Sequence, residues 1–304
     1  MPCLALKVDV DTLRGTREGV PRLAALLERK GIRATFLFSV GPDHTGRAIR
    51  RVFRRGFVGK VRRTSVLQHY GLKTLLYGVL LPGPHIGRRC RQELRAVAAA
   101  GFEVGLHTHD HVRWQDGVAH ANEAWTRREL IRGCDAFAGA FGRAPIMHGA
   151  AGWQMNEFVP SLQHELGFML ASDTRGSEPF MPIACGVEVP VPQLPTTLPT
   201  LDELIGRPDL DRVDPVRHLL ALTSDGRDHV YTLHAELEGG TYLQDFEALL
   251  NGWRTQGYAL GSLGESAARM DVETIPRCTI EKGIVEGRAG HLAVQGPVRP
   301  EISS

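Results

Sequence analysis

The sequence lacks acidic side chains over one long stretch: no Asp or Glu occurs between His44 and Gln92. The net charge is only +2, so positive charge is concentrated in this window rather than spread over the 304 residues. A basic block of this kind is typical of contact with anionic lipid headgroups or nucleic acid, or of a solvated face. The basic residues are Arg47, Arg50, Arg51, Arg54, Arg55, Lys60, Arg62, Arg63, Lys73, Arg88, Arg89 and Arg91.

Cysteines and long apolar runs are also scarce. The five cysteines are scattered and none forms a C-x-x-C pair, which argues against a disulfide framework and against a thiolate zinc site. The longest strongly apolar stretch, Leu75–Leu81, is far shorter than the roughly 20 residues of a membrane-spanning helix. Asp9 interrupts the first apolar run, so no signal peptide is recognised. We expect a cytoplasmic protein.

Several nucleotide and hydrolase motifs are missing. The sequence contains no G-x-S-x-G elbow, no G-x-x-x-x-G-K phosphate loop and no G-x-G-x-x-G fingerprint. Serine hydrolases, nucleotide hydrolases and dinucleotide enzymes are therefore disfavoured. No aromatic stacking platform accompanies the basic window, so nucleic acid ranks last among its partners.

Two carboxylates stand at alternate positions of the first apolar run, Asp9 and Asp11. Alternate residues of a strand point to one face, so both carboxylates leave a buried segment together. Burying two like charges is costly unless a cation or a proton lies between them. The pair therefore indicates a cation site, although most lone D-x-D pairs are strand-end carboxylates that reach solvent.

A second cluster supports the cation site. His107 and His111 follow another apolar run at i, i+4 spacing, which a helical turn or a wide loop can bring to one ion. Two imidazoles and one carboxylate leave a coordination position open for water, as in catalytic zinc sites. The ion would lower the pKa of that water, and the second carboxylate could act as general base. His109 lies between the two histidines and is expected to face away from them.

Strand and helix signals alternate along the chain, which predicts an α/β fold with parallel strands, either a barrel or a doubly wound sheet. In such folds the carboxyl ends of the strands meet at one mouth. Six polar positions would lie at this mouth: Asp9, Asp11, His107, His111, Asp173 and His234. Strands are expected at 4–10, 34–40, 103–107, 146–149, 168–173, 187–191, 229–234 and 258–260, and helices at 17–30, 88–100, 123–140, 156–166, 214–224 and 243–256.

The predicted catalytic domain covers residues 1–269, with the basic and apolar window 44–92 as an insertion. From about Met270 the periodicity fades. Residues 270–304 are therefore expected to form a C-terminal extension, and 287–304 a poorly ordered tail.

These residues resemble the motifs of the polysaccharide deacetylase (NodB-homology) family. The resemblance implies a distorted (β/α)7 barrel with a divalent metal ion, zinc, manganese or cobalt. It gives Asp9 the role of base and makes Asp11, His107 and His111 the metal ligands. His234 would be the general acid and Asp173 its partner, keeping it protonated. The third motif departs from the family pattern: where an arginine orients the base, this chain has Met147–Trp153, and Arg175 and Arg14 are the candidates for that role.

Five further segments narrow the resemblance to deformylases that act on 4-deoxy-4-formamido-L-arabinose linked to undecaprenyl phosphate. This resemblance covers roughly residues 4–265 and implies a place in lipid A aminoarabinose modification and polymyxin resistance. It implies substrate contacts from Trp153, Arg175 and Gly152, with backbone N–H groups near Gly152 facing the oxyanion. The segments are 9–21, 38–43, 150–153, 197–203 and 232–236.

A lipid-linked substrate fits the basic window. Its arginines and lysines would attract the inner leaflet of the cytoplasmic membrane, and the segment Leu72–Leu81 would dip into the interface. Residues 47–81 are thus the expected peripheral membrane contact.

Three other functions compete with the deformylase hypothesis. A secreted polysaccharide or peptidoglycan N-deacetylase shares the barrel but would need an export signal. A non-haem iron oxygenase also uses two histidines and a carboxylate, and would consume oxygen. A non-catalytic lipid-carrier or membrane-binding protein would not need all six polar positions filled.

Overall fold

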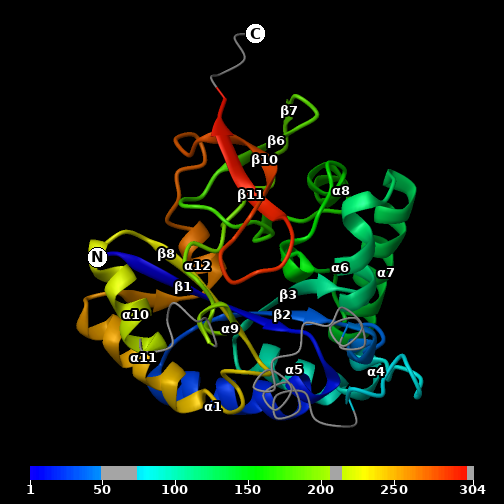
Figure 1. The fold of residues 1–304 in the computed structure, drawn as a ribbon, viewed down its shortest axis with the longest axis horizontal. Helices are drawn as coiled ribbons and strands as arrows, with labels where there is room; N and C mark the ends of the chain where they lie inside the picture. Colours follow the sequence, from blue (N-terminus) through cyan, green and yellow to red (C-terminus); the bar gives the residue numbers. More distant parts are fainter. Residues whose placement is uncertain (49–73, 206–213, 300–304) are drawn as a thin grey trace.

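The fold is built on a seven-stranded sheet, and every strand pairing within it is parallel. The computed structural model describes residues 1–48, 74–205 and 214–299 (Figure 1). The strands of this sheet run in the order β5-β4-β3-β2-β1-β8, with β9 also paired to β1. They are β1 Cys3–Val10, β2 Thr35–Ser39, β3 Glu103–Thr108, β4 Met147–His148, β5 Leu170–Ala171, β8 His229–His234 and β9 Ala259–Gly261.

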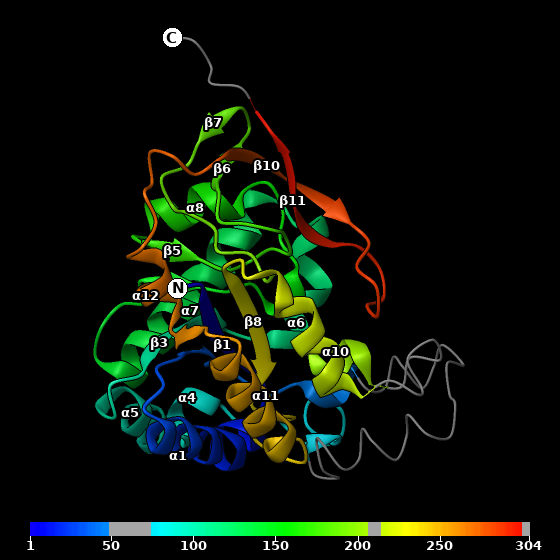
Figure 2. The same cartoon turned by 90° about the vertical axis from the view of Figure 1, so that its left-hand side faces the viewer.

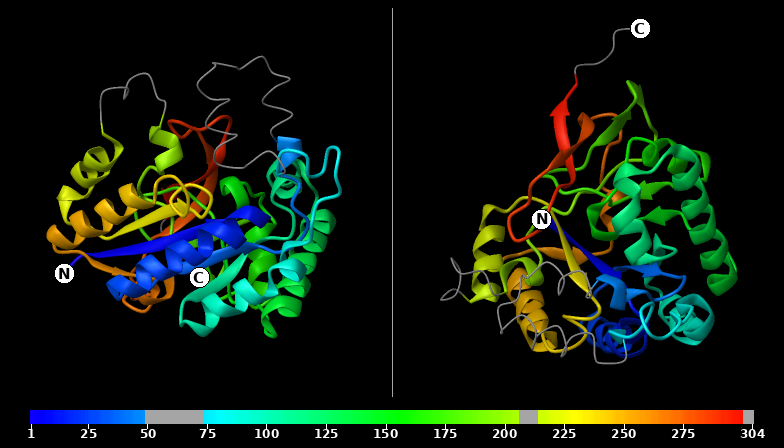
Figure 3. Two further views of the ribbon diagram at one scale, coloured as in Figure 1. Left: turned by 90° about the horizontal axis from the view of Figure 1, so that it is seen from below. Right: turned by 45° about the vertical axis from the view of Figure 1, so that its right-hand side comes forward.

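Helices cover the outside of this sheet, as the alternating pattern predicts (Figure 3). The first helix, α1, packs on the sheet because Leu23, Leu26 and Leu27 on one of its faces are buried. Pro21 lies in its first turn, and Gly31 ends it with a left-handed φ of 61°. The helices are α1 Val20–Lys30, α4 Ile86–Arg89, α5 Arg91–Ala99, α6 His111–Gly117, α7 Glu123–Phe141, α8 Val159–Glu165, α9 Leu201–Leu204, α10 Pro215–Leu222, α11 Leu243–Thr255 and α12 Leu263–Ala267, with short helical turns η1 Gly15–Gly19, η2 Val118–His120, η3 Ala151–Trp153 and η5 Thr223–Asp225.

Residues 192–197 close the sheet into a distorted barrel. They lie between β5 and β8 and bond to both, through Leu194 N to Ala171 O at 2.8 Å and Thr197 N to Val230 O at 3.1 Å. The hydroxyls of Thr196 and Thr232 lie 2.6 Å apart across the same gap. The expected (β/α)7 barrel is therefore confirmed.

A second sheet lies beside the first and was not expected from the sequence (Figure 2). It has the order β11-β10-β6-β7, with β6 Met181–Ala184, β7 Val187–Glu188, β10 Arg277–Gly283 and β11 Leu292–Val298. The expectation of a poorly ordered tail is wrong for residues up to 298, because β11 pairs with β10 and β10 pairs with β6. The boundary at residue 269 stays a prediction.

The apolar core fills the space between the large sheet and its helices. Every residue of β1 and β2 is buried, including Phe36 and Phe38, and they pack with Leu23 and Leu27 of α1. Much of the basic window, with Arg50, Arg51, Arg54, Arg55, Lys60, Arg62, Arg63, Leu72 and Lys73, lies outside the described residues.

Candidate metal centre and active site

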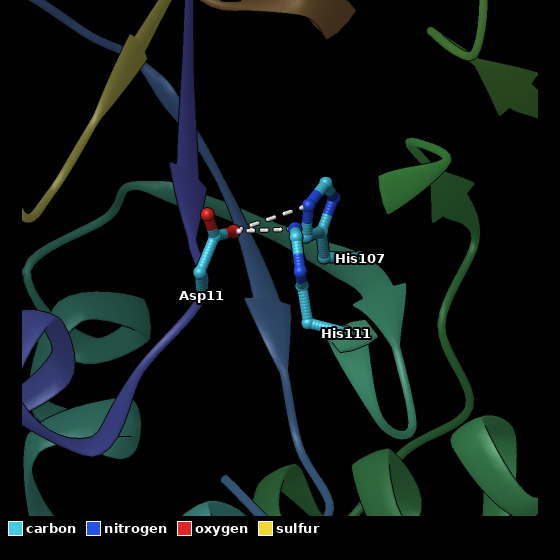
Figure 4. A group of neighbouring side chains, drawn as sticks. All are labelled: Asp11, His107 and His111. Carbon is cyan, nitrogen blue, oxygen red and sulfur yellow. Dashed lines mark ion pairs between the residues drawn. The ribbon is translucent and has the colours of Figure 1, made fainter. Parts of the chain in front are cut away.

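Three side chains, one after β1 and two from β3 and α6 on the far side of β2, meet at the carboxyl end of the sheet (Figure 4). Asp11 directly follows β1, His107 lies in β3 and His111 begins α6. Asp11 Oδ1 lies 3.3 Å from His107 Nε2 and 3.4 Å from His111 Nε2. One ligand atom from each residue falls within 4.8 Å of the others, so the three can bind one ion. The structure thus brings the three expected ligands together, and their role as metal ligands stays a prediction.

The hydrogen bonds of this cluster suit a metal ion. His107 Nδ1 donates to the Gly149 carbonyl at 2.6 Å, which leaves Nε2 as the lone-pair nitrogen facing Asp11. Histidines that bind metals are typically fixed in this way by a second partner. Asp11 Oδ1 is buried and accepts no hydrogen bond. A cation between Asp11 and the imidazoles would satisfy this oxygen.

Charge and burial act against each other here. Burial opposes ionisation of Asp11, but the imidazoles of His111 and His107 outweigh it and hold the carboxyl pKa below its ordinary value. Burial alone would lower the pKa of His107, yet the carboxylates of Asp9 and Asp11 raise it. For His111 burial prevails and lowers the pKa. A neutral His111 and an ionised Asp11 are the forms that bind metals.

Asp9 stands beside this cluster without joining it. Its Oδ1 lies 3.9 Å from His107 Nδ1 and is buried without a hydrogen bond. Its Oδ2 lies 3.6 Å from the Nζ of Lys7, a lysine with no solvent exposure. Lys7 Nζ also donates to Ser172 O at 2.8 Å. Lys7, Asp9 and Asp11 therefore occupy one face of the first strand and its continuation, as alternation requires.

The cation that the structure places beside Asp9 is Lys7, whereas the two arginines expected there pair with other carboxylates. Arg14 instead pairs with Glu18 at 2.9 Å on the exposed side of η1. Arg175 pairs with Glu203 at 2.5 Å and also bonds the Leu198 carbonyl. Lys7, Asp9 and Asp11 alternate in the sequence, and this spacing could have predicted that Lys7 lies on the same face as Asp9.

His234 ends β8, as predicted, but the expected pairing with Asp173 is wrong. Asp173 accepts hydrogen bonds from His148 Nδ1 at 2.7 Å, from Ala150 N, and from the side-chain amides of Gln163 and Gln193. Both of its carboxylate oxygens are thus bound in the core, which leaves no place for a second histidine.

The carboxylate beside His234 is Asp202, whose Oδ1 lies 3.7 Å from His234 Nδ1. Burial lowers the pKa of His234, but Asp202 and then Asp11 outweigh it and raise that pKa. A raised pKa favours the protonated imidazole that a general acid needs. Asp202 lies in the first turn of α9, where Thr200 and Glu203 form a capping box. That T-x-x-E pattern was readable in the sequence as a helix start.

The three expected substrate-binding residues lie close together behind the mouth. Trp153 is only 2% exposed, and its ring lies against the cations of Arg175 at 5.0 Å and Lys7 at 5.4 Å. Gly152 has a φ of 62°, and a Cβ there would come within 2.7 Å of the Gln115 amide. Substrate contact by these residues stays a prediction.

Glu236 is a further buried acid of the site, two residues after His234. Its Oε1 accepts from Asp11 N at 3.1 Å, Thr12 N at 2.9 Å and Thr12 Oγ1 at 2.8 Å. Burial, with repulsion from Asp11, raises its pKa to about 7. A Cβ on Gly15 would come within 2.0 Å of this carboxylate, so a side chain at position 15 would displace it. Glu236 thus fixes the backbone that carries Asp11.

Comparison with known proteins decides the family. The polysaccharide deacetylase family matches residues 2–171, more than half of the chain. The chain belongs to the polysaccharide deacetylase family. It is therefore a hydrolase of the NodB type, and the Asp11, His107 and His111 cluster is a candidate metal site of that family.

Two relatives indicate which members of the family this chain is similar to in sequence. A protein of Shewanella sediminis is 34% identical over 96% of this chain and 94% of its own length. A protein of Wigglesworthia glossinidia brevipalpis is 32% identical over 92% of this chain and 98% of its own length. Both are named probable 4-deoxy-4-formamido-L-arabinose-phosphoundecaprenol deformylase ArnD. The predicted resemblance to these deformylases is confirmed.

Solved structures share the fold. A Mycobacterium smegmatis protein described as a polysaccharide deacetylase superposes with a TM-score of 0.63, at 18% identity, over 93% of this chain and 94% of that one. An allantoinase superposes with a TM-score of 0.59, at 15% identity, over 88% and 89% of the two chains.

Proposed function

We propose that this protein is a metal-dependent deformylase acting on 4-deoxy-4-formamido-L-arabinose carried by undecaprenyl phosphate, in lipid A aminoarabinose modification. One observation carries the proposal: Asp11, His107 and His111 converge beside the Asp9 carboxylate, which lies outside the ligand set, in a chain that aligns with named deformylases over nearly its whole length. The ion would be zinc, manganese or cobalt, which share such ligands.

Asp11, His107 and His111 would hold the ion. When bound, a divalent ion polarises a carbonyl oxygen and lowers the pKa of water. Asp9 accepts the proton of the water that adds to the formyl carbon, and Lys7 holds Asp9 in place. His234 gives a proton to the sugar nitrogen as the C–N bond breaks. A backbone N–H group near Gly152 would stabilise the developing oxyanion. The products are formate and the free amino sugar.

The loop after β2 supports contact with a membrane surface. Leu80 is 77% exposed, and Val79 and Leu81 beside it are also exposed. This apolar tip belongs to the connection that follows the carboxyl end of β2, the edge of the sheet at which Asp11 lies. Arg47 braces the tip through a bond to Gly78 O at 2.9 Å. No helix among the described residues is long and apolar enough to cross a bilayer.

Arg88, Arg89 and Arg91, which follow the tip in the sequence, are also exposed, and exposed basic side chains suit contact with an anionic lipid surface. Each basic residue near such a surface contributes about 1 kcal/mol of attraction. Docking there would bring the mouth of the barrel to a substrate whose carrier stays in the membrane. Of the expected membrane contact 47–81, the proposal uses residues 47–48 and 74–81, which the structure describes.

The deciding experiment is incubation of the purified protein with the formamido-sugar lipid, with and without a chelator. We expect formate release that the chelator abolishes and that added zinc, manganese or cobalt restores. The N-acetyl analogue is the control substrate. Acetate release at an equal rate would favour a general N-deacetylase. Absence of both products would refute the proposed amide hydrolase activity.

A further inference from the structure

The C-terminal hairpin reaches back to the proposed active site. The connection between β10 and β11 runs from the small sheet toward the large one (Figure 1). Arg288 in this connection lies against α9, and Gln154 Nε2 bonds the carbonyl of His291 at 2.7 Å. Gly287 has a φ of 84°, and a Cβ there would lie 2.6 Å from the Glu203 carbonyl oxygen. Only glycine lets the connection approach this closely.

All three guanidinium nitrogens of Arg288 bind groups of α9 or its N-cap. Nη1 lies 2.9 Å from Asp202 Oδ2, and Nη2 lies 3.1 Å from both Asp202 Oδ1 and Thr200 Oγ1. Nε donates to Glu203 Oε1 at 2.8 Å. A bidentate contact of this kind fixes the plane of a carboxylate as well as its position. Arg288 therefore acts on Asp202 as an orienting group.

The orientation of the Asp202 carboxylate in turn affects His234. Its Oδ1 faces His234 Nδ1 at 3.7 Å, and that nitrogen is buried without a hydrogen bond. Thr200 Oγ1 donates to the same oxygen at 2.5 Å, so rotation of the carboxylate is restricted from both sides. The ring of Trp153 lies 4.8 Å from the guanidinium of Arg288 and 5.0 Å from that of Arg175, which limits movement of both cations.

We propose that Arg288 is a positioning residue of the reaction: it aims the Asp202 carboxylate at His234, so that the C-terminal hairpin completes the active site. The inference rests on the proposed function only in its kinetic part. The geometric part, that Arg288 sets the environment of His234 through Asp202, is independent of the substrate.

The test compares Arg288→Met with a matched control, Lys282→Met, which removes one exposed cation from β10 of the same hairpin. We expect Arg288→Met to lower kcat for formate release at least tenfold, with little change in KM, in metal content or in Tm. Arg288→Lys should be intermediate. Guanidinium ion added at millimolar concentration should restore part of the activity of Arg288→Met. Lys282→Met should behave as wild type.

A second readout needs no substrate. The ring nitrogen resonances of His234, assigned with His234→Gln, should shift in Arg288→Met and stay in place in Lys282→Met. Wild-type kcat in Arg288→Met would overturn the inference. So would a loss of activity that guanidinium does not restore and that comes with a lower Tm. If the wild type releases no formate, the proposed function fails, and an unmoved His234 signal in Arg288→Met then overturns the positioning role separately.

Discussion

Two aspartates two residues apart have different neighbours, and the roles proposed for them follow from this difference. Asp11 faces the imidazoles of His107 and His111, whereas the nearest cation to Asp9 is the buried ammonium of Lys7. A carboxylate between two imidazoles is placed to bind a metal ion. A carboxylate beside a lysine, outside the ligand set, is placed to move a proton.

Replacement of Asp9 by Asn should therefore keep the ion and remove turnover. We expect kcat to fall by a factor on the order of 10² to 10⁴, the usual contribution of a general base. His107→Ala should lose the ion itself, which metal analysis after dialysis would detect. A near-normal rate in Asp9→Asn would exclude the base role.

Lys7→Met tests the cation beside the base. The methionine keeps most of the buried stem but removes the ammonium that lies 3.6 Å from Asp9 Oδ2. We expect kcat to fall on the order of 10- to 100-fold with metal content unchanged, because a preorganised charge near the reacting groups is lost. Lys7→Arg should recover part of the rate. Equal kcat in all three proteins would contradict the role.

At the scale of elements, the start of α6 determines where His111 points. Asp110 is the N-cap of this helix and accepts from Arg113 N at 3.1 Å. Its other oxygen bonds His44 Nδ1 at 2.6 Å, which ties α6 to the loop after β2. Asp110 was not identified from the sequence, since the H-T-H-D-H run drew attention to its histidines.

Asp110→Ala should lower the free energy of unfolding by about 1 kcal/mol, the usual loss for an N-cap. It should also weaken metal binding, because His111 is the first residue of α6. Asp110→Asn keeps the cap oxygen and serves as control. Chemical denaturation and metal titration of the three proteins measure both effects. Equal metal affinity in Asp110→Ala would show that the cap does not position His111.

The turn after β8 carries a buried acid with a pH consequence. Glu238 has no solvent exposure, and it accepts from Tyr231 Oη at 3.1 Å and from His234 N at 2.9 Å. Burial raises its pKa to about 7, well above the ordinary glutamate value of 4.5. The folded protein therefore holds a proton that the unfolded chain releases at lower pH.

The sign of this linkage is a loss of stability as pH rises. The contribution is fully present below pH 4.5 and is lost by about pH 7, and it amounts to as much as about 3 kcal/mol. Glu238→Gln should remove this part of the pH dependence. Denaturation of both proteins between pH 4 and pH 8, with a chelator present, measures it. Parallel curves for the two proteins would contradict the assignment.

Local patterns predicted the strands of the large sheet, its helices and the three candidate ligands that the structure brings together. Periodicity predicted β1, α7 and β8 to within one residue, because their buried faces are long and regular, and it placed the start of α1 three residues early. The pairing of Asp202 with His234 was not predictable from pattern, since any carboxylate at the mouth could serve. Arg288 was still less accessible, because a lone arginine in a glycine-rich stretch carries no local signal. A strand was expected at 187–191, where β7 lies, but the small sheet itself was missed because β6 is too short for periodicity and the pattern fades before β10 and β11.

At the scale of the whole molecule, the exposed tip at Leu80 makes a prediction about membrane contact. Leu80→Asp should weaken binding to vesicles of anionic phospholipid about tenfold, because burial of a leucine is worth about 1.5–3 kcal/mol. Met169→Asp is the matched control: Met169 is 67% exposed but precedes β5, at the opposite end of the strands. Co-sedimentation measures both. Equal binding of the two variants would exclude the tip as the contact.

The central place of β1 has a consequence for how this chain folds. On one side β1 pairs with β2, the next strand along the chain, but its other partners, β8 and β9, lie more than 200 residues further on. Such contacts of high sequence separation slow folding and leave an unpaired apolar edge exposed in the nascent chain. We expect refolding from denaturant to be slow, to lose material to aggregation as concentration rises, and to improve with a chaperone.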